Sequence, residues 1–196
     1  LTWSVGQTID FSGHGTDPDE AGDISANRLK WDVILDHCPN DGCHKHFVQT
    51  VEGVTSGSFN GVDHEYPSHL TLKLTVTDDY GLTDTASVDL QPQTALICLL
   101  SDPAGLATTI NLFSGPTPFQ QTVIKGSTVN VATPASQALS GTLYTFESWS
   151  DGGARAHDVT VDGDKTLTAH FVPPTTPGTP RTWARRASAP PSSNCP

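Results

Sequence analysis

The stretch that decides the fold is residues 69–90, which read HLTLKLTVTDDYGLTDTASVDL. Apolar and polar side chains alternate from His69 to Thr77, and the alternation returns from Thr85 to Leu90. A period of two is typical of a strand with one buried face. The segment between them predicts a turn, because Gly81 can adopt a left-handed backbone. We therefore expect a β-hairpin, around which the first half of the chain adds further strands.

The composition predicts an all-β chain. Only 35% of the 196 residues are hydrophobic, while Gly (17) and Pro (15) are plentiful, which suits many short strands joined by turns. We expect two modules, at residues 1–92 and 93–173, joined by a short stiff linker. Residues 174–196 are rich in Pro, Ser, Thr and Arg without periodicity, and we interpret them as a disordered tail.

Charge and hydropathy limit the partners. The net charge is −11, and the acidic excess lies in the first module, so a nucleic-acid partner is disfavoured and divalent cations are favoured. No run of about 18 apolar residues is present, which predicts no membrane span. The chain contains no Met, even at position 1, so we expect a processed product or an excised part of something longer.

A short hairpin brings cysteines and histidines together. Residues 39–42 form a turn between Cys38 and Cys43, and a four-residue hairpin loop would place these cysteines opposite each other as a disulfide. In that register His37 lies across from His44 on the other face, with His46 one pleat further along. A slip of one residue would destroy this arrangement.

The histidines are the sharpest candidate for chemistry. Imidazoles with a carboxylate suit Zn²⁺ or Cu²⁺. The candidate ligands are His37, His44, His46, His64 and Asp63. The alternative is a disulfide-closed hairpin whose histidines hydrogen-bond and cap the end of a sandwich.

The acidic loops are the second candidate. Asp17, Asp19, Asp23 and Asp78 offer the oxygen ligands that Ca²⁺ prefers, although their spacing matches no EF-hand loop. The alternative is a set of solvated turn residues, because Asp favours turns through local hydrogen bonds.

Aromatic residues divide into two groups. Trp31 and Trp149 lie within strands, and we expect both in the core. We expect Trp3, Tyr66, Tyr80 and Trp183 to be partly exposed, and the first three could contact carbohydrate, although isolated surface aromatics are common. Cys98 could pair with Cys195, but a small buried hydrophobe is our preferred interpretation.

Several motifs of residues 1–92 resemble, in order, those of a PKD (polycystin-type) domain. They are Phe11-Ser12-Gly13, Thr16-Asp17-Pro18-Asp19, Leu29-Lys30-Trp31-Asp32, His64-Glu65-Tyr66-Pro67 and Leu74-Thr75-Val76-Thr77-Asp78. The variant is similar to modules that follow the catalytic domain in secreted bacterial glucose/sorbosone dehydrogenases. The resemblance implies an immunoglobulin-like β-sandwich. The usual Gly-Asp-Gly turn after Trp31 is replaced by the Cys and His segment, so any role of that turn does not carry over.

Residues 95–172 resemble bacterial extracellular β-repeats of the internalin B-repeat kind. The matching pieces are residues 101–106, 126–129, 144–153 and 165–171. Both resemblances imply spacer, adhesion or carbohydrate-contacting modules outside the cell. The catalytic domain of the dehydrogenases, with its quinone cofactor, has no counterpart in this sequence.

The resulting expectation is a non-catalytic, secreted accessory segment of a larger bacterial protein, such as a sugar dehydrogenase or carbohydrate-active enzyme. It would act in spacing, adhesion or polysaccharide contact. No Gly-x-Ser-x-Gly, phosphate-loop or His-Glu-x-x-His motif proposes an enzyme. The alternative is a Zn²⁺- or Cu²⁺-binding module, or a metal-dependent enzyme, that uses the four histidines.

Overall fold

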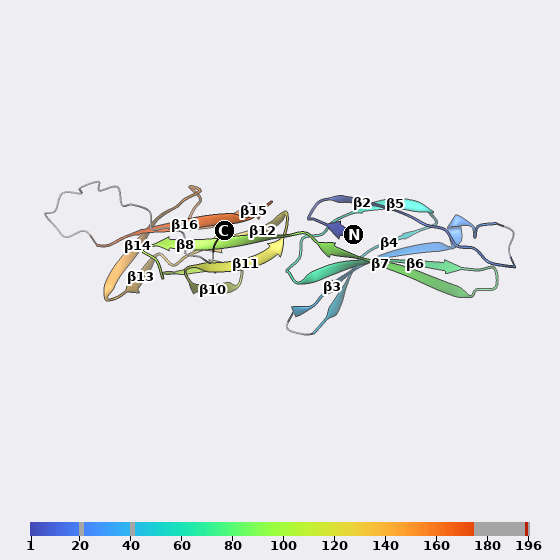
Figure 1. The fold of residues 1–196 in the computed structure, drawn as a ribbon, viewed down its shortest axis with the longest axis horizontal. Coiled ribbons are helices and arrows are strands. Elements are labelled where there is room, and N and C mark those ends of the chain that lie inside the picture. Colours follow the sequence, from blue (N-terminus) through green and yellow to red (C-terminus); the bar gives the residue numbers. More distant parts are fainter. Residues whose placement is uncertain (20–21, 40–41, 175–194, 196) are drawn as a thin grey trace. The chain divides into compact units, whose positions relative to one another are not determined.

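The computed structural model describes residues 1–19, 22–39, 42–174 and 195. It confirms an all-β, sandwich-type fold, whose helical content in the described residues is the single 3₁₀ turn η1 (Ala26–Arg28). The chain divides into two compact units (Figure 1). The first is Leu1–Thr94 together with Val123–Ser127, and the second is formed by the described residues of Ala95–Thr122 and of the chain from Thr128 onward. The predicted tail lies outside the described residues, apart from residue 174 and Cys195.

The first unit is built from a five-stranded and a two-stranded sheet. The five-stranded sheet has the order β1-β7-β6-β3-β4, and β2 pairs with β5 in the smaller one. The strands are β1 (Thr2–Trp3), β2 (Thr8–Ser12), β3 (Leu29–His37), β4 (His44–Glu52), β5 (Ser56–Asn60), β6 (Ser68–Thr77) and β7 (Thr83–Pro92). Strands β6 and β7 form the predicted hairpin, and Gly81 in its turn has a φ of 85°.

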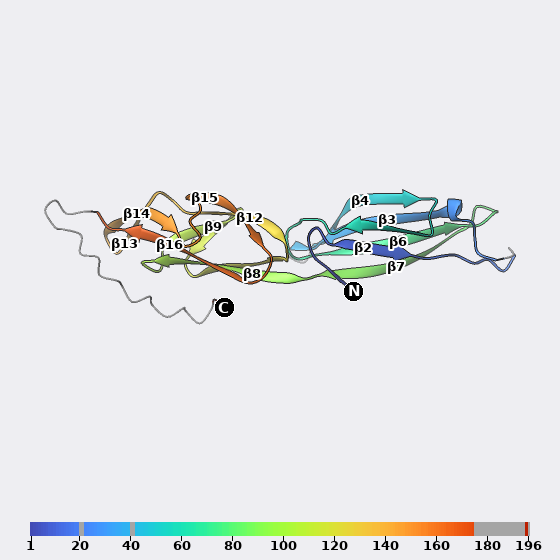
Figure 2. The same ribbon diagram turned by 90° about the horizontal axis from the view of Figure 1, so that it is seen from above.

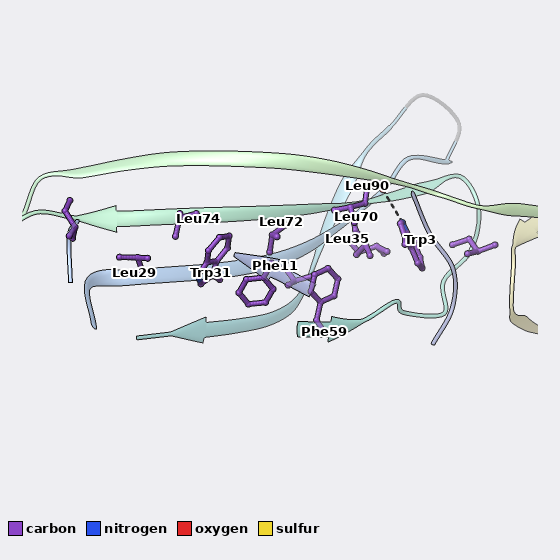
Figure 3. Packing of buried hydrophobic residues seen from close by; sticks show 13 residues of the cluster. Trp3, Phe11, Leu29, Trp31, Leu35, Phe59, Leu70, Leu72, Leu74 and Leu90 are labelled. Carbon is purple, nitrogen blue, oxygen red and sulfur yellow. Dashed lines mark hydrogen bonds between the residues drawn. The ribbon is translucent and has the colours of Figure 1, made fainter. Parts of the chain in front are cut away.

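The core of the first unit lies between its two sheets (Figure 3). Alternate residues of β3 and β6 point into it, because successive side chains of a strand face opposite sides. Trp31 packs against Phe11 of β2, with ring centroids 4.6 Å apart, and its indole N–H donates to the Val54 carbonyl oxygen at 3.0 Å. Trp31 is therefore part of the core, as expected.

The second unit contains a five-stranded and a four-stranded sheet (Figure 2). Their orders are β11-β8-β16-β14-β13 and β10-β9-β12-β15. The strands are β8 (Thr94–Asp102), β9 (Ala107–Ile110), β10 (Phe113–Pro116), β11 (Phe119–Ile124), β12 (Ser127–Ala132), β13 (Ser136–Leu139), β14 (Thr142–Trp149), β15 (Ala156–Val161) and β16 (Lys165–Val172). Trp149 is buried, as expected.

Two features of the second unit do not follow from the alternation of apolar and polar residues in its sequence. Residues 108–113 alternate like one strand, but Asn111 has a φ of 53° and turns the chain between β9 and β10. Strand β13 carries no strong alternation, yet it pairs with β14 through a tight turn in which Ser140 and Gly141 both have positive φ. Two such residues in succession fit the turn that joins twisted antiparallel strands.

Candidate metal centre

The hairpin of β3 and β4 has the predicted register at its turn. Cys38 and Cys43 form a disulfide with Cα atoms 4.0 Å apart. His37 pairs with His44, and His46 lies opposite Leu35. Residues directly opposite each other in a ladder share a face. His37, His44 and His46 therefore lie on the face that holds Leu35, which is the core face of the sheet.

A β-bulge decides which side chains of β4 face this way. The register shifts between Val33 and Ile34, which pair with Gln49 and Phe47, so Val48 is the extra residue. Without the bulge, the pairing would put Phe47 opposite Leu35 and turn His46 to the outer face. With it, His46 faces inward and Phe47 is 67% exposed. Bulges often re-aim side chains at functional sites.

The fourth histidine comes from the connection between β5 and β6. Residues 61–67 cross the end of the hairpin, and the Cys38 amide donates to the Pro67 carbonyl oxygen at 3.0 Å. This connection places the His64 ring beside His37, with centroids 4.5 Å apart, and beside His46 at 4.8 Å. Three separate segments thus contribute histidines to one cluster.

The nitrogen atoms of three of these rings converge. One ring nitrogen each of His37, His46 and His64 lies within 4.8 Å of the others. A tetrahedral zinc ion with nitrogens at 2.0–2.1 Å needs them about 3.3 Å apart, so the rings must draw together by small rotations. The His44 ring adjoins the group, with centroids 5.0 Å from His37 and 4.7 Å from His46.

The protonation of His37 and the hydrogen bonding of His64 also suit a metal. Burial, followed by the neighbouring His64 and His44 rings, lowers the pKa of His37 from 6.5, which keeps its imidazole neutral. Nδ1 of His64 lies 3.3 Å from the Glu65 carbonyl oxygen. A hydrogen bond from Nδ1 to this oxygen fixes the tautomer and leaves Nε2 to bind an ion, as in most histidine metal ligands.

The other predicted ligands do not join a converging group. Asp63 is exposed and is not a member of the histidine group. Within the described part of the chain, Asp17, Asp19, Asp23 and Asp78 form no group of three metal ligands. Asp17 accepts a hydrogen bond from the Asp19 amide at 2.7 Å, and Asp78 accepts from Tyr80 and Leu82 amides. These two carboxylates stabilise their own turns, which is the alternative interpretation of the acidic loops.

The expected partial exposure is wrong for Trp3 and is confirmed for Tyr66 and Tyr80. Trp3 is fully buried, and its indole N–H donates to the Leu90 carbonyl oxygen at 3.2 Å (Figure 3), so it cannot stack on a sugar. Tyr66 is 45% exposed and Tyr80 is 81% exposed. Trp183 lies outside the described residues.

The preferred interpretation of Cys98 is also wrong. Cys98 is buried, as expected of a small hydrophobe, but it forms a disulfide with Cys195. Sequence reasoning left this pairing open, because nothing in residues 174–196 shows where Cys195 returns.

Sequence reasoning also missed the bulge in β4. The one signal for it is the adjacent apolar pair Phe47 and Val48, which interrupts the alternation of the strand.

In the described residues, no helix is long and apolar enough to cross a membrane. No known family model matches the chain, and no curated protein matches it either. The resemblances to PKD domains and to internalin-type repeats therefore remain predictions.

Proposed function

We propose that the first unit is a metal-binding module for Zn²⁺ or Cu²⁺, held by His37, His46 and His64. The observation that supports this function most strongly is the convergence of three ring nitrogens to within 4.8 Å. Imidazole suits both ions, and three histidines are a known catalytic zinc ligand set. His44 adjoins the group and is the candidate fourth ligand.

The exposure of the rings supports reversible binding. His37 is buried, His64 is partly buried and His46 is exposed. An ion at this site would contact the core on one side and exchange with solvent on the other. It would also join β3, β4 and the connection before β6, so binding should stabilise the first unit.

We place this module in a non-catalytic accessory segment of a larger secreted protein. The support is the pair of disulfides, Cys38–Cys43 and Cys98–Cys195, since disulfides persist in oxidising compartments. The parent protein would be an enzyme or surface protein, as the resemblances imply.

A direct titration tests the metal proposal. Protein stripped with a chelator is titrated with Zn²⁺ and, separately, with Cu²⁺, and binding is measured by calorimetry. We expect one ion per chain, with binding lost in His46→Ala and in His64→Ala. The matched control is His69→Ala, because His69 lies on the opposite face of β6, 3.8 Å from Asp36. Failure of the unmodified protein to bind either ion would refute the proposal.

Polysaccharide contact is the second candidate, favoured by the strong exposure of Tyr80 at the tip of the β6–β7 hairpin. It rests on Tyr80 and Tyr66, because Trp3 is buried. Retention of the protein on an insoluble glycan, weakened in Tyr80→Ala, would support it. Retention that is equal in both proteins would contradict a role for this side chain.

A further inference from the structure

A buried hydroxyl group lies beside the histidine cluster. Ser68, the first residue of β6, is only 5% exposed, and its Oγ has no hydrogen-bond partner. An unpaired buried polar group costs about 1–3 kcal/mol, so its presence calls for an explanation.

The register places Ser68 next to His37. The two residues are directly opposite in the ladder of β3 and β6, and the next pair on the same face is Leu35 with Leu70. Ser68, His37 and His44 therefore form one row across three strands on the core face. Side chains in such opposite positions have Cβ atoms about 4.5–5.5 Å apart.

Each ring of a metal-binding histidine needs a partner for its second nitrogen. This partner is usually a carboxylate, a backbone carbonyl or water, and its removal typically lowers metal affinity by 10- to 100-fold. His64 has the Glu65 carbonyl oxygen in that position, and His46 is exposed to water. His37 is the buried ring, so its second N–H needs a partner from the protein.

We propose that Ser68 is the positioning residue of the metal site. When one nitrogen of His37 binds the ion, the N–H of the other donates to Ser68 Oγ, which fixes the ring. The inference rests on the proposed metal-binding function. It explains why a strand of alternating leucines begins with a buried, unpaired hydroxyl group.

The test compares Zn²⁺ affinity and metal-free stability in three variants. Ser68→Ala removes the hydroxyl group, Ser68→Thr retains it, and Ser127→Ala is the matched control. Ser127 has an equally buried, unpaired hydroxyl group but lies outside the cluster. We expect Ser68→Ala to bind Zn²⁺ roughly 10- to 100-fold more weakly while the metal-free protein is no less stable. Ser68→Thr and Ser127→Ala should bind like the unmodified protein.

The outcomes separate the two proposals. If the unmodified protein binds no Zn²⁺, the metal-binding function itself fails. If it binds, and Ser68→Ala binds equally well, the role of Ser68 is refuted. Glu65 is the alternative acceptor for the second ring N–H of His37, because its charge acts on that ring. Loss of affinity in Glu65→Gln but not in Ser68→Ala would assign the role to Glu65 instead.

Discussion

The two units both contain histidine rings packed against neighbouring side chains, but they use those rings differently. In the second unit, Nε2 of His157 lies 2.9 Å from Asp151 Oδ2, and Nδ1 lies 2.7 Å from the Ala154 carbonyl oxygen. Both partner atoms only accept hydrogen bonds. Both ring nitrogens of His157 are therefore engaged, and the ring has no nitrogen left for a metal.

The cluster in the first unit has the opposite character. Its rings contact one another, and burial with neighbouring imidazoles favours the neutral form of His37. Nitrogens that are close together and not committed to acceptors are what a transition metal requires. The contrast indicates that the partners of a histidine ring, more than its exposure, decide whether its nitrogens are available to a metal.

Removing one proposed metal ligand should give the largest difference in stability between the two units. At a Zn²⁺ concentration of 100 times Kd, the ion should stabilise the unmodified protein by about 2.7 kcal/mol. His64→Ala should lose that stabilisation, whereas His157→Ala should keep it. Urea unfolding with and without Zn²⁺ measures both. Equal stabilisation of all three proteins would place the ion elsewhere.

Removing the carboxylate of the second unit should have a smaller, metal-independent effect. Asp151→Asn weakens a charge-assisted hydrogen bond that is partly exposed, so we expect a loss of about 1–2 kcal/mol. Asp162→Asn is the control, because Asp162 is exposed and its nearest ion pair, to Lys165, spans 3.8 Å. Urea unfolding of both variants without metal provides the measurement. A loss that Zn²⁺ reverses would contradict the structural role.

Lowering the pH should reduce the stability of the two units in different pH ranges. We expect these changes in stability to be smaller than those caused by the substitutions above. Burial tends to raise the pKa of Asp151, but hydrogen bonds from His157 and the Gly153 amide lower it below 3.8. Its contribution to stability is complete above pH 3.8 and is lost as pH falls through the folded-state pKa. Because the pKa of His37 lies below 6.5, the metal-free first unit should lose stability as pH falls below 6.5.

Measuring the free energy of unfolding from pH 3 to pH 8 checks these two ranges. His37→Gln should remove the change below pH 6.5, and Asp151→Asn should reduce the change below pH 3.8. The same pH dependence in both variants and the unmodified protein would show that other groups titrate.

Local sequence predicts much of the first unit. Alternation identifies β3 and β6, and the spacing of Cys38 and Cys43 predicts the disulfide and the pairing of His37 with His44. These features depend on neighbours in sequence and on one turn, so period and turn length suffice.

Other features depend on contacts between distant segments. The approach of His64 to the hairpin depends on the path of residues 61–67, which no periodicity specifies. The burial of Trp3 follows from the parallel pairing of β1 with β7, in which Trp3 lies opposite Pro92. A two-residue strand has too little sequence to predict such a pairing.

X-ray absorption at the zinc edge tests most directly whether histidine rings of the first unit bind the ion. We expect a nitrogen shell at about 2.0–2.1 Å with the multiple scattering of at least three imidazoles. His157→Ala should leave the spectrum unchanged. A shell of oxygen atoms without imidazole scattering would contradict binding of the ion by these histidines.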